Sequence, residues 1–295
     1  MNLGIIFAIT AGFLWSVTNL LDKTVVTKYI RKVSQIYLPL SLVSLLMGGV
    51  SLIYDGQIPK IEHLLLIVIA AILWIIMGYV YFRSAQLEEI SRVAPLFALT
   101  PVLILIFSGI FLNEIFSLKI YLGIIIILVG SILILSRGNL KQIFKSRVLG
   151  LMIVSATGAA GTAIIEKYLS NYYNYWSVFG WIYLMAGLLG LVVFYRSIKE
   201  YIILRHESDW RGFWLMIVSE GNSGLANFAY ITAMSFWYIS LVSAASTIQY
   251  LFVFLWTLLL AKLKPGLINE EINRKIAFQK IVAIIFIIGG IFLIT

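Results

Sequence analysis

Long apolar segments recur along the whole chain, and they restrict its possible folds more than any other feature. A helix needs about 20 mostly apolar residues to cross a bilayer, and ten such segments can be placed in this sequence. They cover residues 3–21, 36–54, 62–82, 93–112, 119–136, 149–169, 176–195, 211–233, 239–261 and 276–294. A membrane barrel would need alternating polar and apolar residues, whereas these segments are continuously apolar. The sequence therefore predicts an all-α integral membrane protein with ten transmembrane helices.

The composition agrees with this class of protein. Of the 295 residues 61% are hydrophobic and 12% are charged, whereas soluble domains carry about 25% charged residues. The first apolar segment begins at Leu3 without a basic flank or a cleavage site, so we expect a true span and not a signal peptide. The chain has no cysteine, which excludes disulfides, thiol catalysis and cysteine-ligated metals, and no metal or cofactor is expected.

Lysine and arginine are distributed very unevenly between the loops. The loops after spans one, three, five, seven and nine, with their flanks, hold 19 of these residues. The other loops hold Lys60, Lys119 and Lys167. Because cytoplasmic loops are enriched in lysine and arginine, the sequence predicts a multi-pass protein of the cytoplasmic membrane with both termini outside the cytoplasm. The net charge of +9 is thereby explained without nucleic-acid binding.

Five spans in each half imply that the second half enters the membrane in the opposite sense to the first. Such inverted repeats are common in secondary transporters. The expected repeats are residues 1–147 and 148–295. Three pairs of segments match in the same order: Leu3–Lys23 with Leu149–Lys167, Tyr81–Val93 with Tyr230–Val242, and Leu128–Leu135 with Ile287–Ile294. The sequence therefore predicts two inverted five-helix repeats.

The first pair of matched segments ends in an acidic residue followed by lysine in both halves. These positions are Asp22-Lys23 and Glu166-Lys167, and the repeat places them at opposite membrane faces. They could gate or couple transport. They could also be interfacial anchors, in which lysine reaches the headgroups beside a compensating acid. The sequence leaves both roles open.

Leu14-Trp15 with Asn19 and Lys23 resembles a first-span motif of the EamA-type, ten-span members of the drug/metabolite transporter superfamily, although Ser16 stands where glycine is usual. The stronger likeness is the segment from Ile90 to Leu135. It carries a span-four proline, a following glutamate and a glycine-rich fifth span, at Pro101, Glu114, Gly123 and Gly130. The corresponding unit from Ile239 to Leu260 lacks the proline and the glutamate.

The resemblance implies a secondary transporter that moves a small metabolite, such as an amino acid or an amine, by alternating access. It also implies a cavity lined by spans one, three, four, six, eight and nine. A proton is a candidate coupling ion, membrane lipid is a second partner, and monomer and homodimer both remain open. One alternative is a flippase for a lipid-linked sugar or phosphate. An intramembrane enzyme is not expected, because His63 lies at a span edge and His206 in a loop, and no paired-acid metal motif occurs.

Glu220 is the one acid in the middle of a predicted span, and a charge kept there usually has a function. Ser223, Asn227 and Tyr230 follow at helical spacing and form one polar stripe with it, as its expected hydrogen-bond partners. A buried structural acid is the alternative role. The other residues that we expect to contact the substrate are Trp15, Asn19, Trp74, Tyr81, Ser243, Thr247 and Tyr250. For the polar residues of span nine, close helix packing is an alternative explanation.

Overall fold

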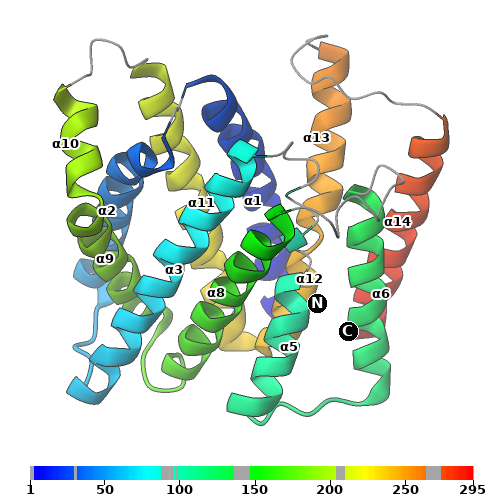
Figure 1. Ribbon diagram of the computed structural model, residues 1–295. Coiled ribbons are helices and arrows are strands. Elements are labelled where there is room, and N and C mark those ends of the chain that lie inside the picture. The colour runs from blue at the N-terminus through cyan, green and yellow to red at the C-terminus, as the bar shows by residue number, and fades with distance from the viewer. Residues whose placement is uncertain are drawn as a thin grey trace.

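A computed structural model describes residues 3–29, 32–87, 93, 96–97, 99–135, 147–203, 210–263 and 274–294. All regular secondary structure in these residues is helical (Figure 1), which confirms the predicted class. The helices of the first half are α1 (Leu3–Lys28), η1 (Val33–Ile36), α2 (Tyr37–Asp55), α3 (Ile61–Leu87), α5 (Leu99–Phe111) and α6 (Leu118–Leu135). Those of the second half are α8 (Arg147–Leu169), α9 (Tyr175–Val193), α10 (Tyr195–Ile203), α11 (Trp210–Phe236), α12 (Ile239–Ser246), α13 (Gln249–Leu263) and α14 (Arg274–Ile294).

Several of these helices have the length and hydropathy of a membrane span. In the described residues five segments meet both criteria by themselves, Leu3–Val26, Val33–Asp55, Ile61–Leu87, Val148–Leu169 and Tyr175–Val193. Shorter apolar stretches follow in α5, α6, α12 to α13, and α14. The 27-residue helix α11 is not among the five, because polar residues such as Glu220, Asn222 and Asn227 lower its mean hydropathy.

The structure differs from the predicted spans in three places. Helix α1 continues to Lys28, beyond the predicted end at residue 21. The ninth span is divided between α12 and α13, with a turn at Thr247 and Ile248. The loop after span seven contains an additional short helix, α10, which packs against α9 and η1. Some predicted loop residues, among them Lys141 and His206, lie outside the described residues.

The most extensive helix packing always joins one helix from each half of the chain. The pairs are α1 with α11, α2 with α9, α3 with α8, and α6 with α14. Glycines let two of these pairs approach closely. A β-carbon on Gly48 of α2 would lie 2.6 Å from the backbone nitrogen of Leu184 in α9. A β-carbon on Gly290 of α14 would lie 2.7 Å from the carbonyl oxygen of Gly123 in α6.

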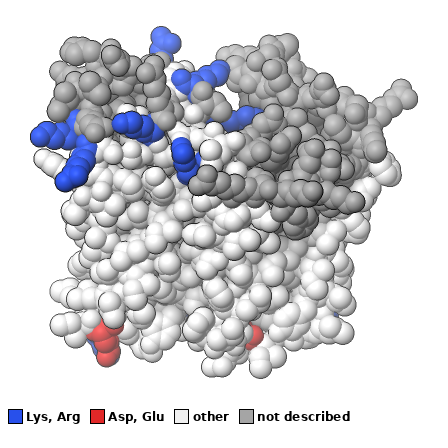
Figure 2. Space-filling model, in the orientation of Figure 1, with Lys and Arg blue, Asp and Glu red and all other residues white. Residues whose placement is uncertain are grey.

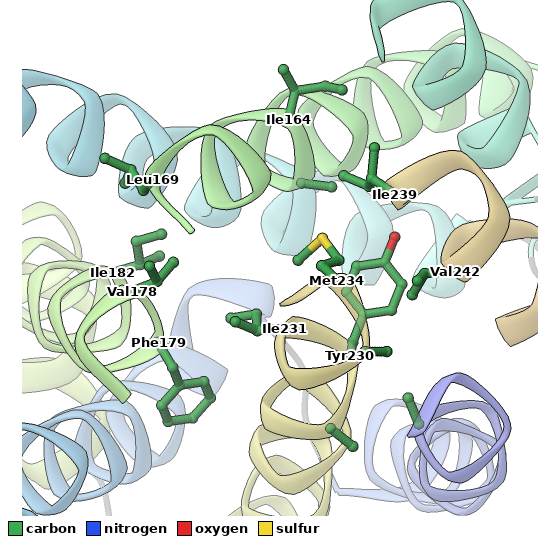
Figure 3. Packing of buried hydrophobic residues seen from close by; sticks show 14 of the residues in the cluster. Ile164, Leu169, Val178, Phe179, Ile182, Tyr230, Ile231, Met234, Ile239 and Val242 are labelled. Carbon is green, nitrogen blue, oxygen red and sulfur yellow. The ribbon is translucent and has the colours of Figure 1, made fainter. Parts of the chain in front are cut away.

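Two apolar clusters lie at the two ends of the bundle. We call these ends upper and lower, by their place in Figure 1. The lower end holds the C-termini of α8 and α11, and its cluster includes Leu169, Met234 and Ile239. In Figure 3 side chains from α8, α9, α11 and α12 point toward one another there. The upper end holds the C-termini of α1 and α3, and its cluster includes Val25 and Ala85.

Charged side chains follow the same division into two ends. On the face drawn in Figure 2, the described lysines and arginines gather at the upper end, and acidic side chains lie near the lower end. The broad middle of this face is uncharged. A band of this kind is what a bilayer requires, because charged side chains are costly at the depth of the lipid tails.

Candidate substrate-binding site

A cavity of about 220 Å³ lies in the middle of the bundle. Helices α1, α3, α5, α8 and α11 and the α12–α13 segment supply most of its lining residues, and these are the six spans that the resemblance implied. Pockets for drug-sized ligands measure roughly 300–1,000 Å³. The space therefore suits a small solute.

All the residues that the sequence suggested for substrate contact lie around this one cavity. They are Trp15, Asn19, Trp74, Tyr81, Glu220, Ser223, Asn227, Tyr230, Ser243, Thr247 and Tyr250. The two acid–lysine pairs behave differently, because Asp22 and Glu166 belong to the lining but Lys23 and Lys167 do not. Asp22 was expected at a membrane face. It faces inward because α1 does not end at residue 21.

The break in the ninth span brings polar groups to the cavity. α12 ends at Ser246 and α13 begins at Gln249, and both residues line the cavity together with Thr247. The Thr247 hydroxyl donates to the Ala244 carbonyl at 2.6 Å, and the Ser246 hydroxyl donates to the Ser243 carbonyl at 2.8 Å. Side chains thus satisfy carbonyls beside the broken helix, as membrane proteins require of irregular backbone at such depth.

Asp22 joins α1 to α11 at the upper end of the cavity. The Ser219 hydroxyl donates to Oδ1 of Asp22 at 2.6 Å. One turn lower on α1, Nδ2 of Asn222 donates to the Thr18 hydroxyl at 2.9 Å and to the Leu14 carbonyl at 2.6 Å. Sequence reasoning missed Ser219 and Asn222, and the only signal for them was their place on the same polar helix as Glu220. These bonds fix the register between α1 and α11.

Glu220 lies next to this contact and is buried, with 5% of its surface exposed. The carboxylate of Asp22 is near enough to act on it electrostatically. The expected partners on its own helix do not bond to it: Nδ2 of Asn227 donates to the Ser223 carbonyl at 2.9 Å. Among the described residues no group donates a hydrogen bond to the Glu220 carboxylate. The polar stripe exists, and all four of its members line the cavity without a hydrogen bond to the Glu220 carboxylate.

Glu166 and Lys167 point in different directions at the lower end. Glu166 is 5% exposed and lines the cavity, and within the described part of the chain its carboxylate accepts no hydrogen bond. Nζ of Lys167 instead donates to the carbonyls of Met234, at 2.6 Å, and Trp237, at 3.2 Å. These carbonyls lie at the C-terminal end of α11, where a helix favours positive charge. The lysine therefore caps α11 and leaves the adjacent acid uncompensated.

A second polar group lies at the lower end beside this cap. The Ser240 hydroxyl, near the start of α12, donates to Oε2 of Glu114 at 3.1 Å and shares a hydrogen bond of 2.6 Å with the Ser108 hydroxyl. Glu114 was noted in the sequence only as part of a family motif. Its position in the loop between α5 and α6 lets it bind the opposite half of the chain.

Aromatic rings form much of the remaining wall. The rings of Trp15 and Tyr230 lie 5.2 Å apart, and those of Tyr81 and Phe97 lie 5.0 Å apart. Trp74 and Tyr250 also line the space. Aromatic faces attract organic cations as well as apolar groups. Together with three buried acids, they favour a ligand that is partly apolar and partly positive.

The described residues contain no group of three or more His, Cys, Asp or Glu side chains that could hold a metal ion.

A helical membrane bundle with a central polar cavity is an architecture that membrane transporters use, and comparison with known proteins adds a likeness to one family. Residues 2–136 match the family model described as "EamA-like transporter family". This match covers less than half of the chain and shows the EamA-like family, part of the drug/metabolite transporter superfamily, for residues 2–136. Members of this family are transporters and typically not enzymes. The chain is a multi-pass membrane protein whose first half is similar to these transporters.

One solved structure, titled "Crystal structure of protein", is similar over 98% of this chain and 97% of its own, with 18% sequence identity and a TM-score of 0.70. This likeness supports the fold. No curated protein matches the sequence significantly.

Proposed function

We propose that the protein is a proton-coupled secondary transporter that moves a small metabolite, such as an amine or an amino acid, across the cytoplasmic membrane by alternating access. The observation that carries this proposal is the central cavity, in which Asp22, Glu166 and Glu220 are buried without a lysine, arginine or histidine among the described lining residues. A buried charge is costly unless an opposite charge compensates it. A proton or a cationic group can fill that role at each acid.

The helix packing supports two inverted repeats, residues 1–147 and 148–295. In two such repeats α1 would correspond to α8, and α3 to α11. The packing of α1 on α11 should then have a counterpart in the packing of α8 on α3, and both contacts are observed. The α2–α9 and α6–α14 pairs each correspond to themselves. This is the pattern expected of two repeats related by a two-fold axis in the membrane plane. Rocking of one repeat against the other would then open the cavity to each side in turn.

The distribution of charge supports an orientation in the membrane. The basic upper end would face the cytoplasm under the positive-inside rule, and both termini would lie on the other side. A reporter that is active only in the cytoplasm, fused to either terminus, should then be silent. Active fusions at both termini would reverse the orientation.

Glu220 is proposed as the residue that couples protons to transport. The titratable groups that face it from neighbouring helices are Asp22 of α1, Tyr37 of α2 and Tyr183 of α9. None of these groups is a cation, so a proton or a positive substrate group can neutralise the Glu220 carboxylate. Binding of one would release the other, which is the exchange that a proton-coupled transporter needs.

The flippase alternative is less well supported by the cavity. A lipid-linked phosphate would need positive groups in the lining, and the described lining residues supply three acids instead. The cavity is also smaller than the pockets that hold drug-sized molecules.

The test uses the purified full chain in proteoliposomes with an imposed pH gradient. A mixture of amino acids, amines, sugars and nucleotides is added outside, and the contents of the vesicles are measured by mass spectrometry. We expect at least one solute to accumulate only with the gradient, and Glu220→Gln to abolish its accumulation. Glu62→Gln is the matched control, because this glutamate is exposed at the start of α3. Equal accumulation by wild type and Glu220→Gln would overturn the role of Glu220.

A further inference from the structure

The acids of the cavity lie at its two ends. Asp22 and Glu220 are together at the upper end, since Ser219 bonds to Asp22 and directly precedes Glu220. Glu166 is at the lower end, since the next residue, Lys167, bonds to the carbonyl of Met234. Tyr230 lies at the Glu166 end of the cavity. The ten residues from Glu220 to Tyr230 span about 15 Å of helix α11.

The acids at both ends lack a positive partner among the described residues. Glu166 and Glu220 are each 5% exposed, both line the cavity, and neither carboxylate accepts a hydrogen bond within the described part of the chain. Lys167 is the nearest cation in sequence to Glu166, but its ammonium is bound to the end of α11. Two separate buried acids therefore face the same space without a donor.

The wall between the two ends is mainly aromatic and apolar. Trp15, Trp74 and Ile104 line it, and Ser223 and Asn227 of α11 are polar members. The apolar part of this surface can pack against methylene groups. A ligand with positive groups at its ends and an apolar chain between them would match the whole cavity.

We propose that the substrate of this transporter is an elongated organic cation with two positive groups, a diamine or a similar dication, held between Asp22–Glu220 at one end and Glu166 at the other. This inference rests on the proposed transport function and names its substrate class. Each positive group would lie about 2.8 Å from its carboxylate in a charge-assisted hydrogen bond, so the spacing of the two groups has to match the separation of the two ends of the cavity. A linear chain of several methylene groups can provide such a spacing.

The experiment measures the thermal stabilisation of the purified full chain in detergent by unbranched diaminoalkanes, from diaminoethane to diaminooctane. The n-alkylamines of the same lengths are the matched monocations. We expect diamines of intermediate or greater length to bind about ten- to a hundredfold more tightly than the monoamines, since a second charged hydrogen bond is worth that much. Equal binding of monoamines and diamines, or no binding of diamines at all, would overturn the proposal.

Variants locate the two ends of the ligand. Glu166→Gln should reduce the affinity for the diamine to that of the monoamine and leave the monoamine affinity unchanged. Glu220→Gln should weaken both ligands, and Glu62→Gln should weaken neither. Gel filtration and the melting temperature without ligand show whether each variant is folded. If Glu166→Gln keeps the full preference for diamines, the second positive group does not bind there and the proposal is wrong.

Failure of this inference can be distinguished from failure of the transport proposal. Gradient-driven accumulation of a different class of solute, lost in Glu220→Gln, would overturn the dication and support the transporter. Tight binding of diamines without any gradient-driven flux would support the dication site and overturn proton-coupled transport.

Discussion

Different interactions join the helices at the upper and lower ends of the cavity, although an acid–lysine pair occurs at both. At the upper end the acid makes the contact between helices, because Asp22 accepts a hydrogen bond from Ser219. At the lower end the lysine makes it, because Lys167 binds the carbonyls at the end of α11. The two acid–lysine pairs thus have different structural roles, and the contacts at one end do not describe those at the other.

This difference has a physical reason in the helix ends. At the lower end α11 terminates beside Lys167, so its last carbonyls are unsatisfied and attract a cation. At the upper end Asp22 lies beside the first half of α11. The backbone N–H groups there are bonded within the helix, so only a side chain, that of Ser219, can donate a hydrogen bond to the Asp22 carboxylate.

The largest expected effect is a change in the side from which the cavity can be reached. Asp22→Asn weakens the contact at the upper end and should increase access from that side roughly tenfold, whereas Lys167→Met removes the contact at the lower end and should increase access from the lower side. The chain has no cysteine, so Ser246→Cys provides a single reporter in the cavity for labelling from either face of sealed vesicles. Unchanged labelling in both variants would mean that neither acid–lysine pair controls access and would leave both pairs as anchors.

The next effect concerns the lysine cap at the lower end. Lys167→Met keeps the length of the side chain but removes both hydrogen bonds to α11, which should lower the free energy of unfolding by about 2 kcal/mol. Unfolding in mixed micelles with increasing dodecyl sulfate measures this change. Lys119→Met is the control, because Lys119 is exposed in the first turn of α6 and should change stability by less than about 0.5 kcal/mol. Equal losses in both variants would mean that the cap does not stabilise the lower end.

A smaller effect tests whether the two ends are independent. Ser219→Ala removes the donor to Asp22, and Ser240→Ala removes the donor to Glu114, and each should cost about 1–2 kcal/mol. Because the sites are far apart and share no partner, the double variant should lose the sum of the two within about 0.5 kcal/mol. The same unfolding assay applies, with Ser235→Ala as the control for an exposed serine bonded within its own helix. A coupling larger than about 1 kcal/mol would show that the two ends are not separate units.

The sequence predicted much of the architecture because hydropathy reports directly on the solvent around a helix. The helices lie where the apolar segments lie, and the polar stripe on α11 was visible from its spacing. The matches between halves pointed to Asp22 and Glu166 as related positions. They did not show that both acids face one cavity, because the end of an apolar segment was taken as the end of its helix. A helix continues past a charge wherever other helices cover it, as α1 does to Lys28.

Other features had no local signal at all. The segment around Thr247 contains neither glycine nor proline, yet the helix breaks there, because neighbouring side chains and the close approach of α1 stabilise the turn. A β-carbon on Gly12 of α1 would lie 2.7 Å from the Ser246 carbonyl oxygen. The partner of Lys167 lies 67 residues further along the chain, and that of Asp22 lies 197 residues further. Bonds of this range depend on which helices meet.

The sequence by itself determined the membrane class, the positions of the helices, the separation of charge between loops and the residue types that a polar cavity would need. These properties follow from the free-energy cost of placing polar groups in lipid. That cost depends on the composition of each segment by itself. The tertiary structure alone decided that Asp22, Glu166 and Glu220 share one space while Lys167 is bound elsewhere. That outcome depends on the rotation and register of packed helices, which are set by contacts between segments far apart in the chain.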